Sequence, residues 1–237
     1  MIGGFGNKKM KEAIAWQLEK SLPKFLERGN KVGWQERSIL LSEAFAFCAM
    51  GDLFDIDVVL ESGIWLGRST EIWTRYFYPK RVTAIDCSLK KEVKDRLAEY
   101  DNLTLLQGEG PDLIPKLLEK PETQRVAVFI DGPKSPRSVI LAGKCLTYSK
   151  VFFVAVHDMQ SSNAKQMVRS LGYPVFFTDE EWFLKKYSKM DRGESRWDEK
   201  QGLKWIPYHI VSKVKGVDKK LESYGMTVAF IFNFRRF

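Results

Sequence analysis

The chain of 237 residues contains only three cysteines and two histidines. Cys48, Cys87 and Cys145 are odd in number, lie far apart and form no Cys-x-x-Cys pair, which argues against a disulfide framework and a structural zinc site. A reducing compartment fits this pattern. The histidines, His157 and His209, belong to no Gly-x-Ser-x-Gly or His-Glu-x-x-His motif, so a serine-hydrolase triad and a zinc protease are not expected.

Long apolar runs and linkers are also missing. The longest apolar runs, such as Val151–Val156, are far too short to cross a bilayer, and residues 1–9 lack the apolar core of a signal peptide. No stretch rich in Gly, Ser or Pro separates two domains, and no repeat of solenoid period is present. We therefore expect a cytoplasmic protein that does not associate with membranes.

The composition is that of a globular protein with a basic surface. Hydrophobic residues make up 44% and aromatic residues 13% of the chain, which is enough for a substantial apolar core. The 38 Lys and Arg residues exceed the 30 Asp and Glu residues, giving a formal net charge of +8. This charge favours anionic partners such as nucleic acid or phosphorylated substrates, but it does not indicate a fold or a reaction.

Two helices are expected before the first strand. Apolar side chains recur at every fourth position of 8–27, which predicts one apolar stripe on a helix that Pro23 interrupts or kinks. The stripe consists of Ile14, Leu18, Leu22 and Leu26. A second helix over 38–50 is apolar on most sides and is expected to end before Gly51.

Short apolar segments then alternate with helical ones. The expected strands are Asp57–Glu61, Arg81–Asp86, Leu103–Gln107, Arg125–Asp131 and Val151–Asp158. The expected helices are Ser69–Tyr78, Leu89–Tyr100, Pro111–Glu119, Pro136–Tyr148 and Ser161–Leu171. Strict alternation with uniformly apolar strands indicates a parallel sheet covered by helices on both faces, so the sequence predicts a doubly wound α/β domain.

The remainder of the chain combines two further strands with a charged segment. Tyr173–Thr178 and Met226–Asn233 read as strands, and Lys219–Tyr224 as a short helix or turn. The charged segment between them contains Trp182, Trp197 and Trp205, which could line an acceptor site or anchor the segment on the core. We thus expect an N-terminal helical extension, an α/β domain and, within that domain, an insertion or lid: residues 1–52, 53–237 and 179–220.

Ligands of open parallel sheets bind at the carboxyl ends of the strands, and these ends are polar here. The first strand leads into a turn with Gly63 and Gly67, which permit close approach of a ligand to the backbone. Ser69 or Thr70 could cap the following helix and leave amide donors facing the ligand. A plain strand-to-helix turn explains two glycines equally well.

Two acidic residues follow the next strands. Asp86 ends the second strand about twenty residues beyond the glycines, where a carboxylate can accept hydrogen bonds from both ribose hydroxyls of a nucleoside. Glu109, after the third strand, could face an adenine edge, although an acid on the surface is the simpler interpretation for this residue alone.

These positions resemble the class I S-adenosylmethionine-dependent methyltransferases. The pattern Glu61-x-Gly63-x-x-x-Gly67 looks like the first motif of that family, Asp86 like its ribose-binding acid and Glu109 like its adenine-side position. The segments most similar to small-molecule O-methyltransferases of the catechol and sugar-modifying kinds are Leu66–Thr70, Phe129–Gly132 and Val156–Asp158.

The resemblance covers residues 57–171 and has consequences for fold and cofactor. It implies a mostly parallel, Rossmann-like sheet of about seven strands with an antiparallel C-terminal strand. It also implies that S-adenosylmethionine is bound by Glu61, Gly63, Gly67, Ser69, Asp86 and Glu109. The N-terminal helices and the Trp-containing segment are not explained by it.

Asp131 and Asp158 are candidate metal ligands. They end two consecutive strands, so their carboxylates should meet at one edge of the pocket and could hold Mg²⁺, which would make an acceptor hydroxyl easier to deprotonate. The family usually completes this site with an Asp-Asn pair, whereas this chain has His157 before Asp158. His157 could be a ligand, the base itself or a buried histidine bonded to backbone, and Asn163 could be a third ligand.

Lys134 is a candidate general base. The spacing Asp131-x-x-Lys134 matches an Asp-x-x-Lys of catechol-type O-methyltransferases, in which the lysine takes the acceptor proton. The role requires a lowered lysine pKa, through desolvation or a nearby cation. An ordinary exposed lysine after a Gly-Pro turn is the alternative.

Three functions remain open from the sequence. The first is O-methylation of a small hydroxylated acceptor, assisted by Mg²⁺ in one version. The second is methylation of RNA on the same fold, motivated by the positive charge and the tryptophans, without an Asn/Asp-Pro-Pro-Tyr/Phe motif to support it. The third is a noncatalytic binding protein. The N-terminal helices could also pair two copies into a homo-oligomer.

Overall fold

The computed structural model describes residues 5–35, 38–121, 123–134, 136–191, 196–198, 203–205 and 227–233. Their centre is a seven-stranded sheet of order β3-β2-β1-β4-β5-β9-β6. Its strands are β1 (Val58–Ser62), β2 (Arg81–Asp86), β3 (Leu103–Gln107), β4 (Val126–Ile130), β5 (Val151–Val156), β6 (Val175–Phe177) and β9 (Ala229–Phe232). All neighbouring strands from β3 to β5 are parallel, and β9 is antiparallel to β5 and β6. The predicted mostly parallel sheet with an antiparallel C-terminal strand is confirmed.

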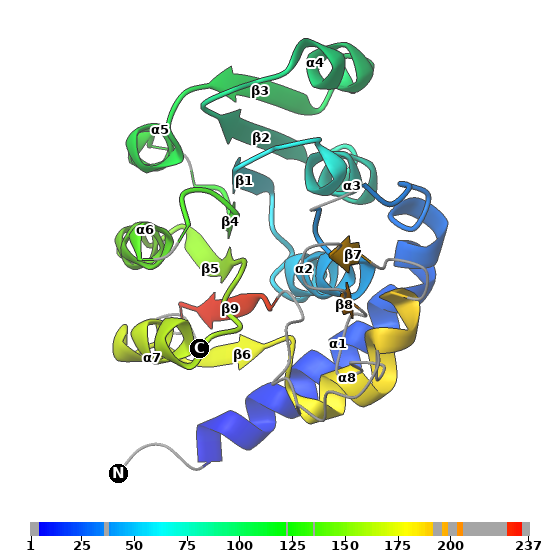
Figure 1. Cartoon of the computed structure of the whole chain (residues 1–237). Helices are drawn as coiled ribbons and strands as arrows, with labels where there is room; N and C mark the ends of the chain where they lie inside the picture. The colour runs from blue at the N-terminus through cyan, green and yellow to red at the C-terminus, as the bar shows by residue number, and fades with distance from the viewer. Residues whose placement is uncertain are drawn as a thin grey trace.

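Helices cover both faces of this sheet, as predicted for a doubly wound domain (Figure 1). One face carries α5 (Gly110–Glu119), α6 (Arg137–Leu146) and α7 (Ser162–Ser170). The other carries α1 (Phe5–Arg28), α2 (Leu41–Leu53), α3 (Arg68–Phe77), α4 (Lys91–Leu97) and α8 (Glu181–Tyr187). None of the described helices combines the length and the apolar character that crossing a bilayer requires.

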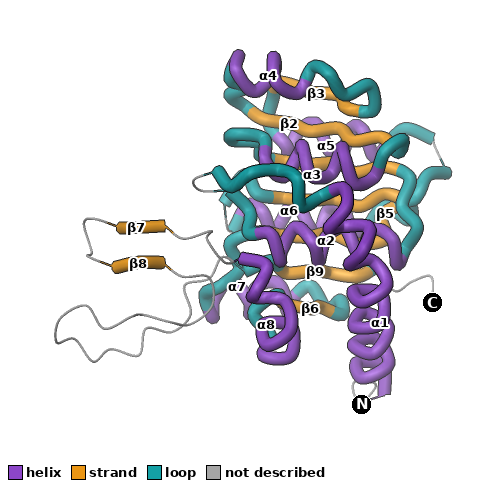
Figure 2. Tube along the Cα trace, turned by 90° about the vertical axis from the view of Figure 1, so that its right-hand side faces the viewer, coloured by secondary structure: helices purple, strands orange, loops and turns teal. Residues whose placement is uncertain are grey.

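The charged segment after β6 begins with α8 and a 3-10 helix (Ser188–Asp191). Two further strands, β7 (Arg196–Asp198) and β8 (Leu203–Trp205), pair antiparallel with each other outside the main sheet, as Figure 2 shows. The expected helix Lys219–Tyr224 and the residue His209 lie outside the described residues.

The N-terminal helix α2 packs directly on the sheet. The Phe47 ring lies 4.3 Å from that of Trp73 in α3, measured between centroids. It lies 5.4 Å from the rings of Phe129 in β4 and Phe153 in β5. These contacts make α2 part of the main hydrophobic core. Burial of one such side chain contributes about 1.5–3 kcal/mol to stability.

Three details of the N-terminal helices differ from the prediction. Helix α1 continues through Pro23 to Arg28, so the predicted interruption is wrong. Phe25 is fully buried in place of Leu26, which is 49% exposed, because a spacing of four residues drifts about 40° around a helix at each step. Helix α2 also runs past Gly51, where a Cβ atom would collide with the ring of Phe77, so this glycine makes room for α3.

Candidate functional site

The loop after β1 is shaped by glycine and lies against the end of β4. Gly63 and Gly67 have φ angles of +95° and +81°, in the left-handed region that favours glycine. A Cβ atom on Gly63 would also lie 2.8 Å from the backbone nitrogen of Gly132, so a larger residue would push these two loops apart. The expected cap of α3 is wrong, since its N-cap residue is Gly67 and no side chain caps the helix.

A cleft of about 120 Å³ opens at the carboxyl ends of β1, β2, β3 and β4. It is lined by Ser62, Gly63, Ile85, Asp86, Cys87, Gly108, Glu109, Gly110, Gly132 and Pro133. Three predicted cofactor-binding residues, Gly63, Asp86 and Glu109, thus come together around one cleft. The predicted Gly67 and Ser69 are not among its lining residues.

Asp86 is held by the backbone of the glycine loop. Its Oδ2 atom accepts hydrogen bonds from the amides of Ile64, at 2.7 Å, and Trp65, at 3.2 Å. Its Oδ1 atom accepts one from the amide of Ser88 at 2.8 Å. These bonds fix the carboxylate at the rim of the cleft and couple its position to that of the loop.

Glu61 lies beneath the loop and does not line the cleft. Its carboxylate is fully buried and accepts hydrogen bonds from Thr70 Oγ1, at 2.6 Å, and Trp73 Nε1, at 3.2 Å. Burial raises the pKa of Glu61 to about 7, despite hydrogen bonds from Ser69, Thr70 and Trp73 that act in the opposite direction. The contacts make Glu61 an anchor between β1 and α3.

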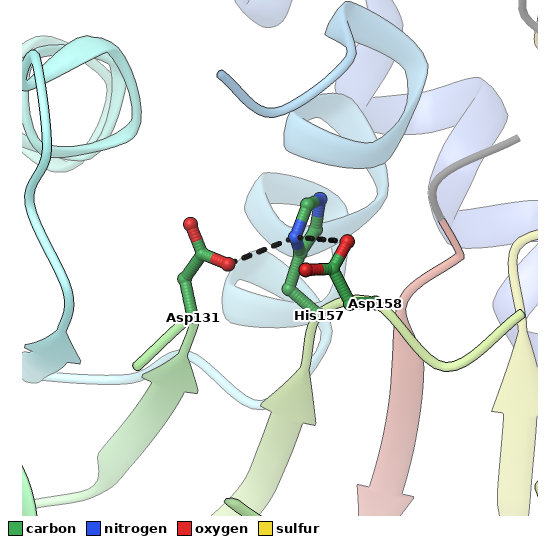
Figure 3. A group of neighbouring side chains, drawn as sticks. All are labelled: Asp131, His157 and Asp158. Carbon is green, nitrogen blue, oxygen red and sulfur yellow. Dashed lines mark hydrogen bonds and ion pairs between the residues drawn. The ribbon is translucent and has the colours of Figure 1, made fainter. Parts of the chain in front are cut away.

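A second polar group lies beside the cleft, at the ends of β4 and β5 (Figure 3). Asp131 follows β4, while His157 and Asp158 follow β5, and the three side chains point toward one another. The Nδ1 atom of His157 lies 2.9 Å from Asp131 Oδ1 and 3.3 Å from Asp158 Oδ1. Asp158 has a φ angle of +63°, which turns the chain out of the strand direction directly after His157.

Lys134 bridges the two carboxylates. Its Nζ atom lies 2.5 Å from Asp131 Oδ1 and 2.6 Å from Asp158 Oδ2. Partial burial alone would lower the pKa of Lys134, but the two neighbouring carboxylates outweigh it and raise the pKa. The lowered pKa that a lysine base requires is therefore not found in this arrangement, which corrects that expectation.

A residue that the sequence did not reveal completes the group. Glu43 of α2 is fully buried, and its Oε2 atom lies 3.4 Å from His157 Nε2. Burial raises the pKa of Glu43, with His157 acting in the opposite direction. The available signal was an acid in the first turn of a mostly apolar helix. Asn163, considered as a further ligand, is exposed on α7.

The charges around His157 and Asp131 stabilise each other. Burial would lower the pKa of His157, but Asp131, Asp158 and Glu43 raise it well above the ordinary value of 6.5. Burial likewise opposes ionisation of Asp131, but His157 and Lys134 hold the pKa of this carboxyl below its usual range. The neighbouring acids thus favour the protonated form of the buried imidazole.

The residues present do not fit the Mg²⁺ that the resemblance implies. One ligand atom each from Asp131, His157 and Asp158 lies within 4.8 Å of the others, which is a spacing suited to a cation. The Lys134 ammonium, however, already contacts both carboxylates, and the His157 Nδ1 that would bind a metal lies 2.9 Å from Asp131 Oδ1. The chain supplies its own cations at this position.

Comparison with solved structures identifies the fold. The O-methyltransferase TomG from Streptomyces achromogenes, solved in complex with SAM, has a TM-score of 0.52 and 16% sequence identity, covering 91% of this chain and 89% of TomG. A precorrin-6y C5,15-methyltransferase from Geobacter metallireducens has a TM-score of 0.50 and 13% identity, covering 85% of this chain and 95% of its own. The chain has the fold of the class I methyltransferases.

A third solved structure has the same fold, whereas comparisons of sequence find no match. The cofactor-bound Rv0187 from MTB has a TM-score of 0.52 and 14% identity, covering 92% of this chain and 89% of its own. No model of a protein family matches the sequence, and no curated protein shows significant sequence similarity to it. The cleft at the carboxyl ends of β1 to β4 includes the point between β1 and β4 where the strand order reverses, and open parallel sheets bind their ligands at such a point.

Proposed function

We propose that the chain is an S-adenosylmethionine-dependent enzyme that methylates a hydroxyl group of a small acceptor. One observation carries this proposal: the cleft and the polar group share a single turn. Gly132 and Pro133 line the cleft, while their chain neighbours Asp131 and Lys134 belong to the polar group. A methyl donor in the cleft would thus lie next to charged side chains that can act on an acceptor.

The cleft has the features that a nucleoside needs. Asp86 and Glu109 supply carboxylates for ribose hydroxyls and an adenine edge, and Gly63 and Gly132 allow the ligand close to the backbone. S-adenosylmethionine supplies a methyl group on a sulfonium, which is transferred by in-line displacement. The remaining task of the protein is to orient the acceptor and to favour its deprotonated form.

The polar group can perform this task. Transfer breaks the bond between sulfur and methyl, forms a bond between methyl and acceptor oxygen, and releases the hydroxyl proton. The Lys134 ammonium, which the two carboxylates hold in place, would stabilise an acceptor oxyanion, since a preorganised positive charge favours negative charge that develops beside it. The adjacent carboxylate of Asp158 could take up the proton. The Asp131-x-x-Lys134 spacing and the O-methyltransferase TomG support oxygen as the acceptor atom.

The proposal is tested by calorimetric titration with S-adenosylmethionine, S-adenosylhomocysteine and, as a nucleotide control, NAD. We expect both sulfur nucleosides to bind and NAD not to bind. Turnover is then measured with catechols and sugars, and with RNA as the competing acceptor class. Binding of none of the nucleosides would refute the proposal, and methylation of RNA alone would refute the small acceptor.

A further inference from the structure

The feature that goes beyond the proposed function is the cation in the acceptor half of the site. Lys134 Nζ is within 2.6 Å of one oxygen of Asp131 and one of Asp158, two carboxylates that come from separate strands. A single positive charge between two such oxygens offsets part of their mutual repulsion and holds them together. This is the structural role that a divalent ion has between paired carboxylates.

His157 lies on the buried side of the same acids. The residue is 4% exposed, and its Nδ1 atom lies 2.9 Å from Asp131 Oδ1 and 3.3 Å from Asp158 Oδ1. The ring nitrogen that faces Asp131 and Asp158 is thus already in contact with both carboxylates. A metal ion between these acids would have to displace this contact as well.

The position of the ammonium also disfavours an added ion. Lys134 Nζ lies within 2.6 Å of Asp131 Oδ1 and Asp158 Oδ2, so a divalent cation placed between these two carboxylates would have to displace it. Removing Lys134 should, by the same reasoning, leave two carboxylates that attract a metal.

We propose that Lys134, with His157 behind it, takes the place of a metal ion, so that this chain holds and activates its acceptor without a divalent cation. The part of this inference that concerns the acceptor rests on the proposed methyl transfer. The other part states that Asp131 and Asp158 do not bind a divalent cation while Lys134 is present, and it can be measured without any turnover.

The test is a titration of the full chain with Mn²⁺. Binding is measured as the loss of the free-ion signal in electron paramagnetic resonance. We expect no saturable binding by the unaltered protein at millimolar Mn²⁺. Lys134→Met should gain one site with affinity raised roughly tenfold or more, and adding Asp131→Asn should abolish that gain. The matched control Lys144→Met, at an exposed lysine of α6, should leave binding unchanged.

Two results would overturn the proposal. Binding by the unaltered chain as tight as by Lys134→Met would show that a metal readily displaces the ammonium. Binding by neither would show that Lys134 does not occupy a cation site. Lys134→Gln replaces the Met variant if the latter fails to fold, as judged by circular dichroism. Because no methyl donor is involved, failure to bind S-adenosylmethionine would refute the proposed function and leave this result standing.

Discussion

The pKa of Glu61 gives a quantitative prediction for stability. A folded-state pKa of about 7 lies above the ordinary value of 4.5 that we assign to the unfolded chain. The folded chain therefore binds the proton more tightly, and the stabilisation that results is fully present below pH 4.5 and is lost as the pH rises through 7. Between pH 5 and pH 8 the loss from this one group is about 2.5 kcal/mol.

The variant Glu61→Gln isolates this effect, because glutamine has the shape of the protonated acid and does not titrate. We expect its free energy of unfolding in urea, relative to the unaltered chain, to rise by about 2.5 kcal/mol between pH 5 and pH 8. His157 and Glu43 also titrate differently in the folded chain, but they are common to both proteins and cancel in the comparison.

The exposed Glu92 of α4 provides the control. Glu92→Gln should show a difference from the unaltered chain that is nearly independent of pH, because surface substitutions change stability by less than about 0.5 kcal/mol. A Glu61→Gln difference that stayed constant within the same margin from pH 5 to pH 8 would refute the argument, since it would mean that Glu61 titrates alike in the folded and unfolded chains.

Three further substitutions test the fold and the cleft. Gly51→Ala should lower the free energy of unfolding by about 1–3 kcal/mol through collision with Phe77, whereas Gly33→Ala, with open space around it, should change it little; equal values would contradict the packing. Asp86→Ala should weaken S-adenosylmethionine binding in calorimetry about tenfold or more, and Asp95→Ala on the exposed face of α4 should not; unchanged affinity would remove Asp86 from the site. Asp191→Ala should cost about 2–4 kcal/mol in urea unfolding, because its buried carboxylate accepts two bonds of 2.7 Å from Ser42, and a loss below 1 kcal/mol would show that these bonds are dispensable.

Most of the sheet could be predicted from the sequence for a simple physical reason. Strands buried on both faces are continuously apolar, so β4 and β5 are visible as runs bounded by polar residues. The strand predicted to end at Asp158 ends at Val156 in the structure. The chain turns at Asp158 with a positive φ angle, which depends on its surroundings and has no local sequence signal. Helix details were less predictable, since the extension of α2 past Gly51 depends on its packing against Phe77 of α3, which lies far away in the sequence.

Individual residues of the site could be predicted from the sequence, whereas the contacts between them could not. The strand-end rule located Asp86, Asp131 and Asp158, because parallel strands bring their carboxyl ends to one edge. The bridge from Lys134 to Asp158 depends on the pairing of β4 with β5, which no local spacing contains. Glu43 reaches His157 only because α2 packs on the sheet, so its role becomes visible only in three dimensions.

The position of β9 has a consequence for how the chain is made. This strand lies between β5 and β6, and among the described strands β6 pairs with no other. During synthesis, one backbone edge of β5 and the whole of β6 therefore lack their partner strand β9 until Ala229–Phe232 has left the ribosome. Unpaired apolar edges of this kind favour aggregation and engage chaperones. A chain cut before Ala229 would thus lose two strands of its sheet, not one.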